Sequence, residues 1–383
     1  MKLKKYIIFS LGILTAFSLT SCSFLEDIFS FEETEDIDTN PTTTTDSETP
    51  KDTTESSMDI PTETTKEDIT EESTSSTDSD DEFIMYGYSD LLKYEKKDKY
   101  ISFYKDVYNS LNTFYSSNTD LETTHIVFSD NTSGDYYIIE NNVNFSKYNL
   151  SYTEAAAIYK TVSLDYPEFY FLDNLLLNGS KGTSQYLQLI CDEDYHLASV
   201  RQDFNQKITT YENLIKEEIK DCKNDIEKVK KIHDYIINNS SYAFKEDGET
   251  ADDSSYSHNI IGIMTKGKGV CESYAKSFQY LLGKNNIECA FGSGYGVDGS
   301  HSESHAWNYV KLNNLWYGFD LTWDDPIYYD NHVLTPKLSY EYFGKVDSDF
   351  TNSHVLLSNV GNMDYGIQYL YNIPTLATSN LVY

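Results

Sequence analysis

The sequence has few basic residues. Over 383 residues, 29 lysines and arginines stand against 62 aspartates and glutamates, which gives a formal net charge of -33. A surface this acidic repels nucleic acids and anionic lipid headgroups, so it argues against a nucleic-acid-binding role. Long apolar runs are missing as well. After residue 22, no segment reaches the ~18 apolar residues that a membrane-spanning helix needs.

Cysteine is also scarce. The five cysteines are Cys22, Cys191, Cys222, Cys271 and Cys289, and their spacing fits neither a dense disulfide framework nor a zinc cluster. A bridge between Cys191 and Cys222 remains an open alternative. Because the sequence also contains no loop of clustered oxygen ligands such as an EF-hand, we expect no metal ion and no cofactor.

The first 22 residues have the features of an export signal. Three lysines precede an apolar stretch, Tyr6 to Leu19, that is short for a membrane span. The stretch ends in Leu19-Thr20-Ser21-Cys22, which resembles the lipobox of bacterial lipoproteins. The resemblance implies cleavage before Cys22, a lipid on its thiol, and an extracytoplasmic protein anchored to the cell membrane. The alternative is an ordinary signal peptide in which this cysteine is coincidental.

Residues 23–82 predict a disordered acidic spacer. They are rich in Thr, Ser, Asp and Glu, and 21 acidic residues stand against two lysines. Such a segment cannot bury enough apolar surface to offset its chain entropy. From residue 83 onward aromatic residues become frequent, which indicates folded structure. We divide this part into an N-terminal α+β region, residues 83–198, and a second domain, residues 199–383.

Residues 199–239 predict two amphipathic helices at the start of the second domain, with a break near residues 222–225. In the second helix, Val229, Ile232 and Ile236 recur at helical spacing and form a buried stripe. His233 belongs to the same stripe. We therefore interpret it as a core or capping histidine and not as a ligand.

A glycine-rich turn followed by a helix carries the first candidate for chemistry. Residues 267–275 run Gly-Lys-Gly-Val-Cys-Glu-Ser-Tyr-Ala, and an apolar stripe continues to Leu282 before Gly283 ends the helix. Cys271 thus lies in the first helical turn. There the unpaired N–H groups and the positive end of the helix dipole favour a thiolate and can hold an oxyanion.

A predicted hairpin carries the second and third candidates. His305-Ala306-Trp307-Asn308 begins one strand, Asn313-Asn314 is a turn signal, and residues 316–323 form the returning strand with Asp320 near its end. His305 and Asp320 can therefore be cross-strand neighbours. In such a pair the carboxylate orients the imidazole, which takes and returns the proton of a nucleophile.

These three motifs, in this order, resemble the transglutaminase-like superfamily. Its bacterial members show Gly-Val-Cys, His-Ala-Trp-Asn and Asp-x-Thr-Trp, which stand here at Gly269–Cys271, His305–Asn308 and Asp320–Trp323. The later Tyr342-Phe343 and His354 also fit exported members. The resemblance covers roughly residues 200–360. It implies an α+β, papain-like core in which the nucleophile helix packs on an antiparallel sheet, with residues 83–198 as an α+β extension.

Several nearby residues have other interpretations. We expect His301 to lie in a loop and Asp324 and Asp325 to shape a turn, while Trp307 and Trp323 pack around the hairpin. The family also implies a second oxyanion donor upstream of the nucleophile. Tyr256, His258 and Asn259 remain open candidates for it.

Together these features predict an extracytoplasmic thiol enzyme that acts on peptide or amide bonds. Cys271 would be the nucleophile, His305 the general base and acid, and Asp320 the residue that orients His305. We expect a monomer whose partners are a protein or peptide substrate at the cell surface and the membrane that holds the lipid anchor. The alternatives are a catalytically silent scaffold or adhesion module and a carbohydrate-binding surface protein.

Overall fold

The computed structural model describes the folded part of the chain together with one dipeptide near the N-terminus. Cys22 and the predicted spacer lie outside the described residues. The described residues are 7–8, 85–128, 132–139, 143–248, 250–325, 327–330, 333–336, 338–356 and 370–382. Within them, no helix is both long enough and apolar enough to cross a membrane.

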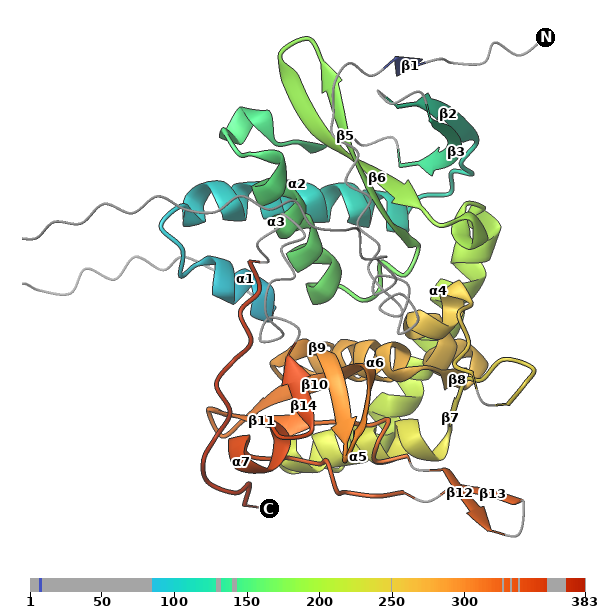
Figure 1. Ribbon diagram of the computed structural model, residues 1–383, viewed down its shortest axis with the longest axis vertical. Helices are drawn as coiled ribbons and strands as arrows, with labels where there is room; N and C mark the ends of the chain where they lie inside the picture. Colours follow the sequence, from blue (N-terminus) through green and yellow to red (C-terminus); the bar gives the residue numbers. More distant parts are fainter. Residues whose placement is uncertain are drawn as a thin grey trace, which may run out of the picture. The chain divides into compact units, whose positions relative to one another are not determined.

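Three α-helices and a mostly antiparallel sheet make up the described part of the N-terminal region, most of which lies in the upper half of Figure 1. Helix α3 begins with a capping box in which Ser151 and Glu154 bond each other's backbone N–H groups, a strong helix-start signal. Helices α2 and α3 pack together beside strands β5 and β6. The sheet has the order β1-β2-β3-β6-β4, with β5 also paired to β6. The elements are β1 (Ile7–Ile8), α1 (Tyr86–Leu91), α2 (Lys97–Tyr115), β2 (Thr123–Val127), β3 (Ser133–Ile138), β4 (Val143–Asn144), η2 (Ser146–Tyr148), α3 (Tyr152–Asp165), β5 (Leu172–Lys181), β6 (Ser184–Cys191) and η3 (Glu193–Tyr195).

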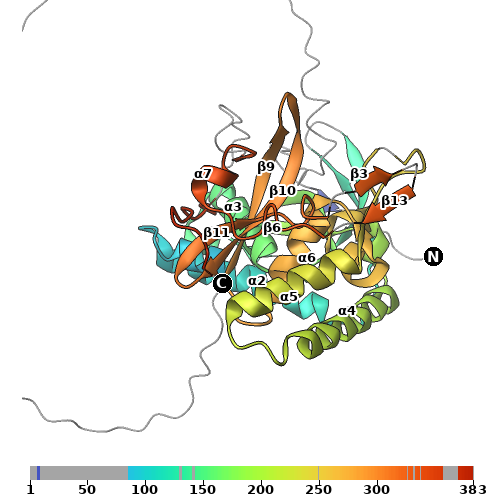
Figure 2. The ribbon, with the colours of Figure 1, turned by 90° about the horizontal axis from the view of Figure 1, so that it is seen from below.

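Three helices cover one side of the second region, where Figure 2 shows α4, α5 and α6 side by side. The predicted break between the first two is confirmed, because α4 ends at Ile219 and Asn224 caps the start of α5 by accepting from Glu227 N. The elements are α4 (Ala198–Ile219), α5 (Asp225–Asn238), β7 (Ser241–Tyr242), η4 (Ser255–His258), the π-helical turn η5 (Gly262–Lys266), β8 (Lys268–Gly269) and α6 (Cys271–Gly283).

Helix α6 packs on an antiparallel sheet with the order β11-β10-β9-β14. Strands β10 and β11 form the predicted hairpin, and Asn313 and Asn314 at its turn have φ values of 52° and 64°, as a tight hairpin turn requires. The elements are β9 (Cys289–Asp298), β10 (His301–Leu312), β11 (Leu315–Phe319), β12 (Ile327–Asp330), β13 (Val333–Pro336), α7 (Asp347–Phe350) and β14 (His354–Leu356). The α+β class and the helix-on-sheet core are as predicted.

The main core is continuous from α2 to α6. Phe103 of α2, Leu187 of β6, Ile208 of α4 and Phe278 of α6 are buried members of one hydrophobic cluster. The predicted division between residues 198 and 199 therefore falls inside a continuously packed part of the chain, and it stays a prediction. No disulfide joins the four cysteines of the described residues, Cys191 and Cys222 included.

Candidate active site

The entry into helix α6 is fixed by backbone hydrogen bonds. Val270 N donates to Ser257 O at 2.9 Å, and Gly269 O accepts from Ala243 N at 2.9 Å. Gly267 has a φ of +65°, which favours glycine at that position. Val270 is the N-cap, so Cys271 is the first residue of the helix, as predicted, and it is 1% exposed. The thiol thus lies at the positive end of the α6 dipole.

His305 and Asp320 meet across the sheet, as their spacing predicted. His305 lies in β10 and Asp320 directly follows β11, its hairpin partner. The His305 Nε2 and Asp320 Oδ2 atoms are 2.7 Å apart, and the two residues are 4% and 1% exposed. A buried carboxylate at this distance fixes the orientation of the imidazole and favours the tautomer with the proton on Nε2. Nδ1 is then the ring nitrogen suited to accept a proton.

A second histidine contacts the same carboxylate oxygen. His354, at the start of β14, places its Nε2 atom 3.0 Å from Asp320 Oδ2 and is 2% exposed. Its ring stacks on Phe350, with centroids 3.8 Å apart. The sequence placed His354 among the family-like residues but gave no sign of this contact, because 34 residues separate it from Asp320.

The surroundings keep Asp320 ionised. Its other oxygen, Oδ1, accepts from Thr322 N at 2.9 Å and Trp323 N at 3.1 Å. Burial alone would raise the pKa of Asp320, but the charge and hydrogen bond of His305, together with the hydrogen bond from His354, hold that pKa well below its usual range. The carboxylate is therefore charged at any pH near neutrality.

Aromatic side chains enclose the His–Asp–His cluster. Trp323 stacks on His305 with centroids 5.0 Å apart, and Trp307 lies edge-on to His354 at 4.9 Å. Gly296 of β9 makes room for them, because a Cβ there would lie 2.7 Å from Trp323 Cζ2 and 3.2 Å from His305 Cβ. Both tryptophans thus pack around the hairpin, as predicted.

The same cluster is where a metal ion could be held. The ligand atoms of His305, Asp320 and His354 lie within 4.8 Å of one another, a set of two imidazoles and one carboxylate. The distances of 2.7 and 3.0 Å are those of hydrogen bonds, which already account for the geometry. Hydrogen bonds from the two imidazoles to the Asp320 carboxylate therefore explain the arrangement of the cluster.

Helix α6 and strand β10 are joined near the site. Asn308 Nδ2 donates to Ala275 O at 3.0 Å, one helical turn after Cys271. Cys271 also shares a buried cluster with Ala306 and Trp307, which follow His305 in β10. Cys271 therefore packs against the part of β10 that directly follows His305.

The three candidates for a second oxyanion donor have different surroundings. Tyr256 OH donates to Asp252, and the Asn259 amide donates to Tyr195 OH and Ser255 O, both at 2.9 Å. His258 Nδ1 lies 3.3 Å from Glu272, the residue after Cys271. These contacts do not select one of the three.

A second buried His–Asp pair joins α5 to the turn that follows Asp320. His233 is completely buried, as predicted, with Nε2 3.1 Å from Asp324 Oδ2 and Nδ1 3.0 Å from Asp234 Oδ1. Burial opposes its charge, but these hydrogen bonds raise the pKa of His233. Asp325 accepts from Tyr274 OH at 2.7 Å. Asp324 and Asp325 thus anchor α5 and α6 as well as shaping the turn we predicted, whereas His301, predicted in a loop, begins β10.

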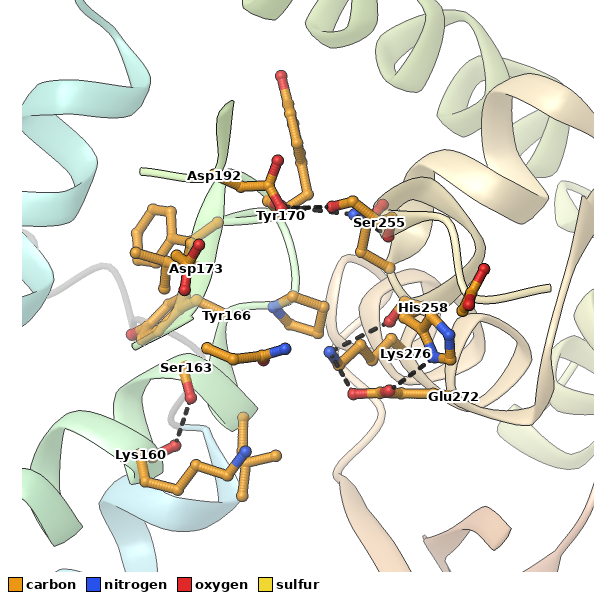
Figure 3. A pocket seen from close by; sticks show the side chains of 17 residues that line it. Lys160, Ser163, Tyr166, Tyr170, Asp173, Asp192, Ser255, His258, Glu272 and Lys276 are labelled. Carbon is orange, nitrogen blue, oxygen red and sulfur yellow. Dashed lines mark hydrogen bonds and ion pairs between the residues drawn. The ribbon is translucent and has the colours of Figure 1, made fainter. Parts of the chain in front are cut away.

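A polar pocket of about 230 Å³ is lined in part by Glu272, the residue after Cys271 (Figure 3). The end of α3 and the start of β5 line it from one region, and η4 and α6 line it from the other. Lys160, Glu272 and Lys276 are among its charged residues. The sequence gave no signal for this pocket, because its walls come from segments about a hundred residues apart.

One family model matches part of the chain, within the range that resembles the transglutaminase-like superfamily. Residues 213–321 match the sequence model of the Transglutaminase-like superfamily. No match was found among curated proteins.

Three solved structures are similar to parts of the chain. They are a candidate cysteine protease from Cytophaga hutchinsonii (20% identity, 38% of this chain and 61% of that one, TM-score 0.25), a structure described as a TGase (12%, 53% and 51%, 0.29), and the periplasmic domain of TgpA from Pseudomonas aeruginosa bound to ethylmercury (12%, 38% and 58%, 0.24). The chain thus spans between half and about three fifths of the length of these proteins.

Proposed function

We propose that the transglutaminase-like domain is an extracytoplasmic thiol enzyme that breaks or exchanges peptide or amide bonds. In this proposal Cys271 is the nucleophile, His305 the general base and acid, and Asp320 the residue that orients His305. The observation that carries it is the buried Asp320 carboxylate, hydrogen-bonded to His305 at 2.7 Å in the sheet on which the Cys271 helix packs.

The reaction proceeds in two halves. His305 takes the thiol proton, and the Cys271 thiolate adds to the substrate carbonyl carbon. Backbone N–H groups at the start of α6 are suited to stabilise the oxyanion that forms. The C–N bond then breaks, and the amine leaves with the proton from His305. Water, or a second amine, gives a proton to His305 and attacks the thioester, which releases the acyl group and restores the thiol.

His354 has a supporting role in this proposal. Its Nε2 atom contacts Asp320 Oδ2, and its ring is held by stacking on Phe350. Two backbone N–H groups hold the other oxygen, Oδ1. A carboxylate with donors on both oxygens cannot rotate freely. His354 is therefore a positioning residue that acts on His305 through Asp320.

The location belongs to the same proposal. The lipobox-like residues before Cys22 support export and lipid anchoring, and residues 23–82 would then provide reach between the membrane and the folded domain. The substrate would be a protein or peptide at the cell surface.

Selective alkylation of Cys271 tests the proposal against a silent scaffold. A thiolate supported by His305 should react with iodoacetamide well below the pH expected for a free cysteine, whose pKa is ~8.5. The other thiols are internal comparators, because burial raises the pKa of Cys191 to about 12 and also raises the pKa of Cys222 and Cys289. Mass spectrometry of the folded protein across pH would follow all four.

Two variants complete the experiment. His305→Ala should shift the labelling of Cys271 to higher pH, whereas His125→Ala, which removes a partly exposed histidine paired with Asp135, should not. Because Cys271 is 1% exposed, the alkylating reagent should be small and uncharged. Labelling of Cys271 no faster than that of Cys222, with no effect of His305→Ala, would leave the scaffold as the better description.

A further inference from the structure

The pocket of Figure 3 contains a charge arrangement that the proposed chemistry does not use. Glu272 lies 2.7 Å from Lys276 and 3.3 Å from His258. Burial opposes its ionisation, but Lys276 and His258 lower the pKa of Glu272 to about 2. The carboxylate is therefore charged, and Lys276 is its nearest cation.

A second cation, Lys160, lines the same pocket. It comes from the end of α3 and is only partly exposed, and among the described residues no carboxylate lies within 4.0 Å of its Nζ atom. Burial and the neighbouring Lys276 lower the pKa of Lys160 to about 7, and the charge of Glu272 offsets only part of that shift. An ammonium group withdrawn from water with no carboxylate in contact with it is destabilising.

A nitrogen atom of His258 adds to the pattern. His258 Nε2 is buried and has no hydrogen-bond partner within the part of the chain that the structure describes, although Nδ1 contacts Glu272. Because the ionised Glu272 carboxylate can only accept, Nδ1 carries the proton, and Nε2 of the neutral ring lacks a donor. In the view of Figure 3, Lys160, Lys276 and Glu272 lie in the lower half, whereas Asp173 and Asp192 lie in the upper half.

We propose that this pocket binds a carboxylate group of a peptide ligand, with Lys160 as its counter-ion. The ligand is a monoanion because Asp173, Asp192 and Asp253 line the same pocket and would repel a group of higher charge such as phosphate. A bound carboxylate restores the ammonium form of Lys160, and a peptide N–H group next to it would supply the donor that His258 Nε2 lacks.

The pocket is next to the candidate nucleophile, because one of its lining residues follows that cysteine in the sequence. Glu272 lines it and is the residue after Cys271, and Leu164, another lining residue, shares a buried cluster with Cys271. As a statement about substrates, the inference rests on the proposed function. It implies that the enzyme prefers peptides with a carboxylate close to the reacting amide, either at a chain terminus or on an acidic side chain.

Competitive acetylation of lysines tests the binding without any need for turnover. With a pKa of about 7, Lys160 should react with acetic anhydride at neutral pH faster than surface lysines, whose ordinary pKa is ~10.4. The probes are three mixtures of N-acetylated tripeptides without lysine. The first has uncharged side chains and a free C-terminal carboxylate, the second has uncharged side chains and a C-terminal amide, and the third has one glutamate and a C-terminal amide. The full chain is used, and mass spectrometry reports Lys160 together with Lys207, an exposed lysine of α4.

At least one of the two carboxylate mixtures should slow the acetylation of Lys160 about threefold when its concentration is twice its dissociation constant. The neutral amides should not slow it. Protection by the first or the third mixture identifies a terminal or a side-chain carboxylate, respectively. Lys207 should be unaffected throughout. Equal protection by the neutral amides, no protection by any mixture, or failure of Lys160 to react at all would overturn the inference.

Lys160→Met provides a second measurement. It removes a partly buried charge, so the fold should persist. The protective mixture should raise the melting temperature of the wild type and not that of Lys160→Met, whereas Lys207→Met should respond like the wild type. An equal rise in Lys160→Met would contradict the inference. Cys271 alkylation, followed separately, reports on the proposed function, so failure of one can be told from failure of the other.

Discussion

Asp320→Asn is the substitution that the site geometry makes most informative. Asparagine keeps the size of the side chain, and its oxygen can still accept from the N–H groups of Thr322 and Trp323. Its NH₂ group then replaces Oδ2 and faces the Nε2 atoms of His305 and His354. Each imidazole would have to turn Nε2 into an acceptor, which places the His305 proton on Nδ1, the wrong nitrogen for accepting a proton from a thiol.

The structure gives the size of the effect. Two hydrogen bonds to a charged carboxylate, at 2.7 and 3.0 Å, are lost, and each contributes about 1.5–3 kcal/mol, so we expect the variant to be about 3 kcal/mol less stable at neutral pH. The pKa of Asp320 is lowered by folding, so its contribution is present above the unfolded value of about 3.9 and is lost as the pH falls. The stability difference should therefore close in acid. Turnover should fall about 10⁴-fold.

Asp324→Asn is the matched control. Asp324 is also buried and also accepts from a histidine, His233, at 3.1 Å, so its loss should destabilise the fold comparably. Denaturant unfolding and the pH profile of Cys271 alkylation would be measured on both variants. Asp320→Asn should change both quantities, and Asp324→Asn only stability. An unchanged alkylation profile in Asp320→Asn, or the same change in Asp324→Asn, would refute the assignment of Asp320 as the orienting residue.

Two further predictions follow from the site and the N-terminus. His354→Leu removes one donor from Asp320, so acid unfolding should begin at a higher pH and turnover should fall, whereas His354→Gln should retain much of both because its amide can donate from a similar position; equal effects of the two would contradict a positioning role. Cys22→Ala should move the protein from the detergent phase to the aqueous phase in phase partitioning and remove a lipid from its N-terminal peptide, and wild-type protein found wholly in the culture supernatant without lipid would contradict the anchor.

Local sequence pattern was sufficient for the helix and the hairpin that carry the site, although it placed His301 in a loop and not in β10. Glycines before Cys271, an apolar stripe after it and Gly283 at its end define a helix whose first residue is the cysteine. The asparagine pair at residues 313 and 314 fixes a hairpin turn, and hairpin register then brings His305 and Asp320 within reach of each other. These relations hold over at most about fifteen residues, where backbone geometry leaves few alternatives.

Contacts between distant segments were decided only by the tertiary structure. His354 reaches Asp320 because β14 pairs with β9, a pairing that no spacing in the sequence encodes. Lys160 and Glu272 line one pocket because the end of α3 meets α6, where Gln279 Nε2 donates to Leu164 O at 2.8 Å. Lys160 looks like an ordinary helical lysine when the sequence is read alone. Local propensity limits what each segment can form, but the burial of charges depends on which segments pack together, and packing of the whole chain determines that.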